Sequence, residues 1–383
     1  MIYYFGNYSR QAVEFELYQS PAAASKMEYI LEVFKKIAPC TLISLTVYKP
    51  RKWKLIRMRR FKYDESETDV VMPSIGSPIR LIRGLNSIII PVFAFLFALL
   101  YVTKDDTVVL YHALPYTIPI VLCKKIKHFS LCVEVEEIYG DVYCDKKMIA
   151  KELRSFKYAD SFLFPTGLLN HKINRDNKQA VIIHGTYQNE KWRRPMFGNS
   201  CIHIVYAGTF DPRKGGAAAA AAAAGFLAAN YHVHIIGFGS KSDTDHIKQV
   251  IAEVSEKSAA TVTYDGCLSG EEYIRFIQSC DIGLSTQNPD AAFNDTSFPS
   301  KILSYMANGL RVVSIRIPAI EESAIGDLVT YYDTQTPEAI AEAILSIDMQ
   351  TPYDSRARIT QLDTEFQKEI GKLIEGFNSE HCR

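Results

Sequence analysis

Residues 204–216 read Ile-Val-Tyr-Ala-Gly-Thr-Phe-Asp-Pro-Arg-Lys-Gly-Gly, an apolar strand followed by a glycine-containing turn, two adjacent cations and the start of a helix. Glycines let the backbone approach a ligand closely. A helix N-terminus offers unpaired N–H groups at the positive end of the helix dipole. Arg213 and Lys214 can neutralise the charge of a diphosphate. The stretch therefore predicts a βα unit with a diphosphate site at its turn, although an ordinary βα turn with solvated cations would show the same pattern.

A second stretch, later in the chain, combines a helix start with a cation. It reads Phe298-Pro-Ser-Lys-Ile-Leu-Ser-Tyr-Met-Ala-Asn-Gly309 and is followed by an apolar run, Leu310-Arg-Val-Val-Ser314. Pro299 and Ser300 are typical of the beginning of a helix. The helix dipole disfavours Lys301 in the first turn unless an anion shares the position. We predict that Ser300, Lys301 and the nearby amides hold a phosphate; a capped helix with an exposed lysine is the alternative.

The rest of the chain alternates short apolar strands with helical stretches. Examples are Thr107–Tyr111 and Phe129–Val135 in the first half, and Tyr231–Ile236 and Arg311–Ile315 in the second. Continuous apolar strands indicate parallel sheets covered on both faces, and repeated βα units indicate doubly wound folds. The alanine run 217–224 predicts a helix from propensity alone. We therefore predict an α/β chain with two Rossmann-like domains joined by the polar stretch 186–200.

Composition sets the broad class of the protein. The chain has 383 residues, 48% hydrophobic and 22% charged, with a formal net charge of zero, as in a soluble globular protein without a global field for nucleic acid. Eight cysteines include no CxxC pair, so we expect neither a disulfide framework nor a zinc site. The first residues, MIYYFGNYSR, do not resemble a signal peptide. We expect a cytoplasmic protein that binds no nucleic acid.

Two segments raise the question of membrane contact. Ile88–Val102 is apolar apart from Pro91 and Tyr101, and is short for a helix that crosses a bilayer. It fits a buried helix of an α/β domain or an in-plane membrane helix, and less well a membrane span. The stretch Lys49–Lys62 carries eight cations and no acid. It fits a charged strand edge or a contact with anionic headgroups or a lipid-diphosphate acceptor, and with Ile88–Val102 it supports peripheral attachment on the inner face of the membrane.

Together, YAGTFDPRKGG (residues 206–216) and SFPSKILSYMANGLRVVS (residues 297–314) resemble the donor-binding half of GT-B glycosyltransferases, family-4-like (glycosyl transferases group 1). Tyr264–Gly270 and Cys280–Ser285 occupy the places of that family's base-binding turn and the strand after it. The resemblance implies a GT-B fold, with two Rossmann-like domains facing a cleft. It implies an acceptor-binding domain at 1–187, a nucleotide-sugar-binding domain at 200–355 and a helix at 356–383 that crosses back to the first domain.

The resemblance also implies the reaction and the donor site. The reaction is transfer of a sugar from a nucleoside diphosphate sugar to the hydroxyl of a sugar or lipid-linked acceptor, with retention and without a metal or cofactor, in surface polysaccharide or glycolipid assembly. Thr296 and Ser304 stand where the family often has two glutamates. The implied donor-binding residues are Gly208, Thr209, Arg213, Lys214, Cys267, Leu268, Thr296, Ser300, Lys301 and Ser304.

Acceptor-side candidates lie where the strands of the first domain end, since open α/β sheets bind ligands at that edge. Gly6 and Asn7 follow the first strand, and His112 follows Thr107–Tyr111. Of the acids after the next strand we favour Glu137 and then Glu136 as the catalytic carboxylate, which could stabilise positive charge on the anomeric carbon or take the acceptor's proton. Salt-bridged acids and a hydrogen-bonded core histidine are the alternatives.

Two other functions fit the same fold. A nucleotide-sugar epimerase would release a new nucleotide-sugar without an acceptor. A non-catalytic nucleotide-sugar-binding paralogue would bind the donor without turnover, and the absence of acids at Thr296 and Ser304 favours it.

Overall fold

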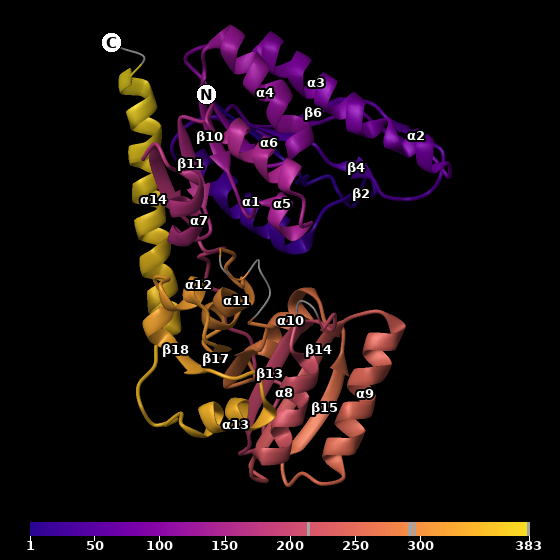
Figure 1. The fold of residues 1–383 in the computed structure, drawn as a ribbon, viewed down its shortest axis with the longest axis vertical. Helices are drawn as coiled ribbons and strands as arrows, with labels where there is room; N and C mark the ends of the chain where they lie inside the picture. The colour runs from indigo at the N-terminus through magenta and orange to yellow at the C-terminus, as the bar shows by residue number, and fades with distance from the viewer. Residues whose placement is uncertain (213–214, 290–293, 295, 381–383) are drawn as a thin grey trace. The chain divides into compact units, whose positions relative to one another are not determined.

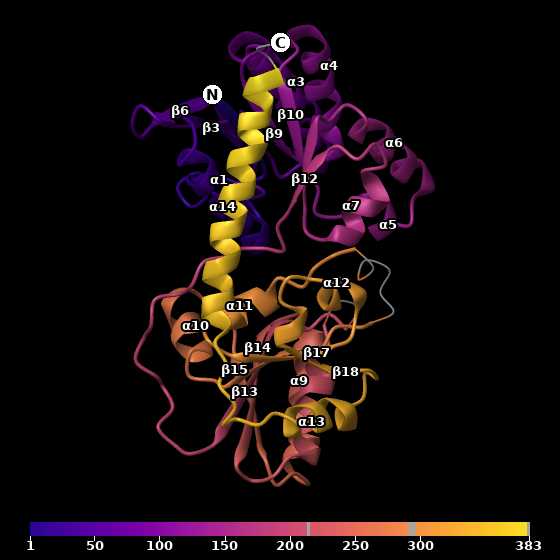
Figure 2. The same ribbon diagram turned by 90° about the vertical axis from the view of Figure 1, so that its left-hand side faces the viewer.

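The computed structural model describes residues 1–212, 215–289, 294 and 296–380. It shows an α/β chain with two compact units, Met1–His184 with Glu365–Arg383, and Gly185–Thr364 (Figure 1). The division falls at residues 184/185, so the polar stretch 186–200 belongs to the second unit. The last helix, α14 (Ser355–Glu380), is continuous and contributes residues to both units (Figure 2).

The first unit is built on an eight-stranded sheet with the strand order β12-β11-β10-β9-β1-β3-β7-β6. Neighbouring strands are parallel except β6 and β7, which pair antiparallel at one edge. The predicted parallel sheet is thus confirmed. The strands are β1 (Ile2–Gly6), β3 (Cys40–Ser44), β6 (Arg59–Lys62), β7 (Glu67–Val71), β9 (Thr107–Tyr111), β10 (Ser130–Glu134), β11 (Ser161–Phe164) and β12 (Gln179–Ile182).

Helices cover this sheet, and the apolar helix α3 contributes much of the core. Its residues Ile90, Ala94 and Phe97 are buried at helical spacing, and the Phe97 ring meets the rings of Tyr3 and Phe5 at centroid distances of 6.1 and 6.3 Å. One face of α3 is therefore part of the core. The helices are α1 (Pro21–Lys35), α2 (Arg80–Gly84), α3 (Asn86–Tyr101), α4 (Leu114–Lys127), α5 (Tyr139–Val142), α6 (Lys146–Phe156) and α7 (Gly167–Ile173).

The basic stretch Lys49–Lys62 is divided between two strands. It forms β5 (Lys54–Ile56), which pairs antiparallel with β8 (Ser74–Gly76), and then β6 at the edge of the large sheet. A second small pair joins β2 (Leu17–Tyr18) to β4 (Val47–Tyr48). Because β6 has only one neighbour, its cations are free to stay in solvent, as is typical of a charged strand edge.

The second unit has a parallel six-stranded sheet with the order β15-β14-β13-β16-β17-β18. Its strands are β13 (Ile202–Thr209), β14 (Tyr231–Phe238), β15 (Thr261–Gly266), β16 (Ile282–Ser285), β17 (Arg311–Ile315) and β18 (Val329–Tyr332). Its helices are α8 (Ala217–Ala222), α9 (Lys241–Ser255), α10 (Gly270–Ile277), α11 (Lys301–Ala307), α12 (Pro318–Glu321) and α13 (Pro337–Leu345), with 3-10 turns at Ala223–Phe226 and Gly326–Leu328. The chain thus has two doubly wound α/β units.

The helix α11 is fixed to this sheet through Tyr305. The Tyr305 hydroxyl accepts a hydrogen bond from the backbone N–H of Ala207 at 2.8 Å and donates one to the carbonyl of Leu284 at 3.3 Å. The ring lies so close to β16 that a Cβ added at Gly283 would be 2.4 Å from it. Glycine at 283 is therefore required for the helix to approach the sheet.

Gly283→Ala should destabilise the second unit by about 1–3 kcal/mol, the usual cost of overpacking a core. The midpoint of urea unfolding measures this. Gly198→Ala is the matched control, because a Cβ at Gly198 meets nothing within 4 Å. Equal midpoints for the two variants would contradict the close approach of Tyr305.

Candidate functional site

The carboxyl end of β13 forms the centre of the predicted donor site. In an open parallel sheet, ligands bind where the strands end. Tyr206 is buried on β13, and its hydroxyl donates to the carbonyl of Thr209 at 2.8 Å, across the turn that begins at Gly208. Burial raises the pKa of the Tyr206 hydroxyl. The tyrosine therefore stays neutral and supports the turn from beneath.

Lys301 reaches this turn from the first position of α11. Its Nζ lies 4.4 Å from the centroid of the Tyr206 ring, and only 3.2 Å from where a Cβ at Gly208 would be. Burial lowers the pKa of Lys301 to about 8. Within the described ranges no carboxylate forms an ion pair with it, so the ammonium is desolvated without a counter-charge. The structure thus places Lys301 beside Gly208, at the turn that Tyr206 closes through Thr209.

A cavity of about 280 Å³ opens beside the same turn. Gly215 and Gly216 form one wall, and the first residues of α8 and the N-terminal turns of α9 form others. A Cβ at Gly215 would be 2.2 Å from the Tyr206 hydroxyl oxygen, and one at Gly216 would be 1.7 Å from the carbonyl oxygen of Thr286. Both glycines are thus needed for this close packing. Arg213 and Lys214, the predicted diphosphate cations, lie outside the described residues.

The other predicted donor residues lie around this edge with different exposures. Cys267 is exposed and Leu268 is half-buried, in the turn that follows β15. Ser304 lies 3.4 Å from the hydroxyl of Tyr273 on α10, the helix after that turn. Ser300 is exposed and has a helical conformation, without a side-chain capping bond to a described residue. Thr296 is buried. Sequence reasoning missed Tyr206, although its place two residues before Gly208 puts both on one strand face.

On the first unit, Tyr4 of β1 and Lys26 of α1 contact two acids at the end of β10. The Tyr4 hydroxyl donates to Glu134 in a short hydrogen bond, and Lys26 of α1 contacts Glu136 with 2.6 Å between Nζ and Oε1. Burial, together with the charge of Glu136, raises the pKa of Glu134 to about 8. Glu136 is therefore an ion-paired acid, and Glu137, one residue on, is half-buried. Sequence reasoning missed Tyr4 and Lys26, because only the fold brings them to Glu134.

His112 is held in the interior rather than on an open surface. Its Nε2 lies 2.7 Å from Oε1 of Glu152, and its ring stacks on Tyr139 at a centroid distance of 5.4 Å. Both members of the pair are buried, and Glu152 also accepts the backbone N–H groups of Tyr139 and Gly140. This pair fixes the start of α5. The contacts match the hydrogen-bonded core histidine that the sequence left as an alternative.

Gly6 and Asn7 lie at the end of β1, on the same sheet edge as Glu134. A Cβ at Gly6 would be 2.9 Å from Sδ of Met27, so α1 packs directly on this strand end. Asn7 is half-buried. The acceptor-side role of Gly6 and Asn7 therefore stays a prediction.

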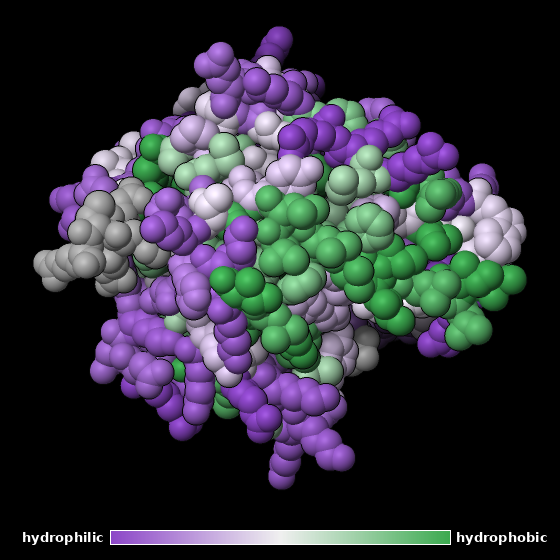
Figure 3. Space-filling view, turned by 90° about the horizontal axis from the view of Figure 1, so that it is seen from above, coloured by the Kyte–Doolittle hydropathy of each residue, from purple (hydrophilic) through white to green (hydrophobic). Residues whose placement is uncertain are grey.

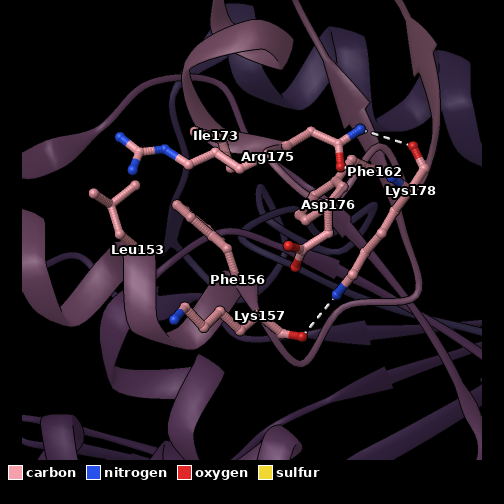
Figure 4. A pocket seen from close by; sticks show the side chains of 9 residues that line it. Leu153, Phe156, Lys157, Phe162, Ile173, Arg175, Asp176 and Lys178 are labelled. Carbon is pink, nitrogen blue, oxygen red and sulfur yellow. Dashed lines mark hydrogen bonds between the residues drawn. The ribbon is translucent and has the colours of Figure 1, made fainter.

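A second cavity, of about 200 Å³, lies on the first unit (Figure 4). It is lined by the end of α6 and by the loop that leads into β12. Its Lys178 donates to the carbonyls of Lys157 and Ala159 at 2.7 and 2.6 Å. The cation is satisfied by backbone, and the cavity is at the amino ends of the strands, so we assign no site there.

Comparison with known proteins identifies the class. Residues 201–348 match the family model of glycosyl transferases group 1. No curated protein matches. The chain is similar in structure to trehalose-6-phosphate synthase from E. coli bound with UDP-2-fluoro glucose, with a TM-score of 0.66, 10% identity and 98% of each chain covered.

Two further solved structures show the same similarity over the full length. One is a trehalose-6-phosphate synthase studied for glycosyltransfer with retention, with a TM-score of 0.64, 10% identity and 99% of each chain covered. The other is Anabaena HepE in complex with UDP, with a TM-score of 0.61, 10% identity, and 100% of this chain and 98% of that chain covered. The fold is therefore GT-B, as predicted. The match to the family model lies within the second unit.

Glu134→Gln should change how stability depends on pH. The folded state holds the proton of Glu134 up to a pKa of about 8, whereas the unfolded chain releases it near pH 4.5. The wild-type protein therefore loses up to about 1.4 kcal/mol of stability per pH unit between these values through this group. The amide cannot titrate, so urea unfolding at pH 5 and pH 8 should show a smaller loss in the variant. An equal loss in both proteins would contradict the assignment.

Proposed function

We propose that the chain transfers a sugar, with retention, from a nucleoside diphosphate sugar to an acceptor hydroxyl, and that Lys301 binds the donor diphosphate. The observation that carries this proposal is the desolvated Lys301 ammonium beside Gly208. Lys301 is half-buried, and because a desolvated cation without a carboxylate partner is costly, an anion placed at the turn would reduce that cost. A diphosphate fits because the turn follows the carboxyl end of β13, the end of the strands where open parallel sheets bind their ligands.

The chemistry that this site would perform is electrostatic. Breaking the bond between the anomeric carbon and the diphosphate leaves negative charge on the leaving phosphate. A fixed ammonium in a partly dry site stabilises such charge more than water does, since it needs no reorganisation as the bond breaks. Arg213 and Lys214, predicted from sequence at the same turn, would add to that charge. A uridine diphosphate sugar is the first donor to test, because two of the similar structures hold UDP or a UDP-sugar.

We place the acceptor on the first unit, at the edge that carries Glu136 and Glu137. Lys26 forms an ion pair with Glu136, with 2.6 Å between Nζ and Oε1. A carboxylate at this edge could stabilise positive charge on the anomeric carbon or accept the proton of the acceptor hydroxyl. The donor domain has Thr296 and Ser304 in place of the acids of related enzymes, so we assign the carboxylate chemistry to Glu137 and then Glu136.

The apolar helix α3 supports attachment to a membrane surface. The helical stretch Arg80–Tyr101 is long and apolar enough to cross a membrane, and only 33% of its most apolar part is buried inside the protein. One face packs in the core, whereas Ile88, Leu96 and Leu100 are exposed by 63%, 42% and 72%. The neighbouring helix α4 exposes Ile118, Leu122 and Ile126. Figure 3 shows the resulting continuous apolar surface.

Cations border this apolar surface. All eight basic residues of Lys49–Lys62 are exposed, and the guanidinium of Arg60 lies 5.2 Å from the ring centroid of Tyr101 at the end of α3. Each cation near an anionic headgroup layer contributes about 1 kcal/mol, and a half-packed apolar helix beside them suits in-plane insertion. We propose that this face lies on an anionic membrane and that the acceptor is lipid-linked.

Lys301→Met should weaken UDP binding by about 1–3 kcal/mol, the range for a hydrogen bond to a charged group. The unliganded variant should be at least as stable as wild type, because a desolvated charge is removed without loss of side-chain volume. Calorimetric titration with UDP and the thermal midpoint measure the two effects. Lys241→Met, at an exposed position of α9, is the control. Unchanged affinity in Lys301→Met would remove the proposed site.

Binding of UDP should also weaken as the pH rises through about 8, the pKa of Lys301 in the free protein. Above this pH the free protein must first take up a proton, so the affinity falls by up to about tenfold per pH unit. The Lys301→Met variant should lack this dependence. A flat profile in the wild-type protein between pH 7 and 9.5 would contradict the role of the ammonium.

The double change Ile88→Glu and Leu96→Glu should reduce binding to phosphatidylglycerol-containing vesicles at least about tenfold, since burying such a side chain contributes about 1.5–3 kcal/mol. Sedimentation with vesicles measures it, and binding of the wild-type protein should fall with added salt. Val13→Glu, at a position exposed by 93%, is the control. Wild-type protein that stays in the supernatant would contradict the membrane proposal.

A further inference from the structure

Three histidines of the second unit meet on one face of its sheet. His203 lies near the start of β13 and pairs in register with His232 of β14, and His234 follows two residues later on the same face. One ring nitrogen of each lies within 4.8 Å of the other two. His203 and His234 are exposed by only 4% and 1%, while His232 is half-buried. The cluster therefore has a closed interior and one side open to solvent.

The hydrogen bonds around the cluster decide which nitrogens of His232 and His234 carry protons. The Thr263 hydroxyl donates its single proton to Asp265 at 2.7 Å, so it can only accept from Nε2 of His232, at 3.0 Å. Asp265 is a carboxylate and accepts from Nδ1 of His234 at 3.1 Å. Both outer nitrogens are thus donors. Their inner nitrogens, Nδ1 of His232 and Nε2 of His234, carry lone pairs in the neutral rings.

The same argument holds for His203. Its Nε2 lies 2.6 Å from Oδ1 of Asn199, and that oxygen also accepts the backbone N–H of Cys201 at 3.3 Å, which identifies it as the amide oxygen. Nε2 of His203 is therefore a donor, and its Nδ1 points inward. That Nδ1 is 2.9 Å from Nε2 of His234. Two lone pairs at this distance repel each other unless the two nitrogens share a proton or a metal ion.

We infer that His203, His232 and His234 form a binding site for a divalent transition metal ion such as Zn²⁺. Neutral imidazole nitrogens are preferred ligands of zinc, copper and nickel. Three protein ligands with a fourth position open to water are a common zinc arrangement.

The hydrogen bonds on the outer side of the three histidines are those expected around a metal site. A metal-bound histidine almost always donates its other N–H to a carboxylate, carbonyl or water, which fixes the ring and raises its basicity. Here each histidine donates to an oxygen, of Asn199, Thr263 or Asp265.

The position of the site assigns it a structural role. His203 lies five residues before Gly208, roughly 17 Å along β13 at about 3.3 Å per residue, so it is at the opposite edge of the sheet from the proposed donor site. Phe197 stacks on the rings of His203 and His234 at centroid distances of 4.3 and 4.9 Å. A bound ion would thus link β13 and β14 to the segment that leads into the sheet.

The experiment uses the full chain, stripped with EDTA and titrated with ZnCl₂ in a calorimeter at pH 7. We expect one Zn²⁺ per chain, and a rise of the thermal midpoint with zinc concentration. Removing an outer partner of a metal-bound histidine usually costs 10–100-fold in affinity, so Asp265→Asn should weaken zinc binding by roughly that factor, and His232→Gln by at least about tenfold. His171→Gln, at an exposed position of α7, should bind as wild type does.

Two further readouts separate this site from the rest of the protein. Co²⁺ bound in place of zinc should give a visible spectrum typical of imidazole ligation, which His232→Gln changes. The affinity for UDP should be equal in His232→Gln and wild type. The tests of the metal site and of the donor site are therefore independent of each other. Less than one Zn²⁺ per chain would overturn the inference and would leave a proton shared by His203 and His234. Binding unchanged in both His232→Gln and Asp265→Asn would overturn it as well.

Discussion

The desolvated ammonium of Lys301 is the interaction on which the proposed chemistry depends. Helix α11 buries Ile302, Leu303, Tyr305 and Met306 on the sheet, so the backbone of its first residue is held next to Gly208. Burial lowers the pKa of Lys301 to about 8, and the folded protein therefore carries an electrostatic cost that an anion at the turn would offset. Functional sites often reduce the stability of the folded protein in this way, because they hold charged groups in place before the ligand binds.

In the second unit, the two sites that we propose lie at opposite ends of the parallel strands. All strands of the second sheet end at one edge, where the glycine turn, Tyr206 and Lys301 lie. The amino ends of β13 and β14, at the other edge, carry the three histidines. On the first unit, the strand ends carry Glu134 and Glu136, while helix α3 keeps one face in the core and leaves the other exposed. Because ligands of a parallel sheet bind at the carboxyl ends of its strands, the amino ends remain available for a separate metal site.

Much of the fold could be predicted from the sequence, and about half of the candidate site. The apolar strands predicted two Rossmann-like domains, since buried parallel strands need uninterrupted apolar runs, and the resemblance of residues 206–216 and 297–314 to a known family implied the GT-B fold. Gly208, Thr209 and Lys301 were predicted together and lie together. Contacts between distant segments could not be predicted. The basic stretch divides into β5 and β6, because each part pairs with a different strand. His112 forms a hydrogen bond with Glu152, forty positions away in the sequence.

The sequence by itself determined the local features of this protein: which segments form strands and helices, where glycine allows a close approach, and which helix begins with a lysine. These follow from hydrophobic period, turn chemistry and helix propensity, all of which act over a few residues. Only the tertiary structure decided that Tyr206 lies under Lys301, that Tyr4 and Lys26 meet Glu134 and Glu136, and that three histidines from two strands converge. The physical reason is that burial and charge pairing depend on neighbours across the sheet, and no short stretch of sequence encodes those neighbours.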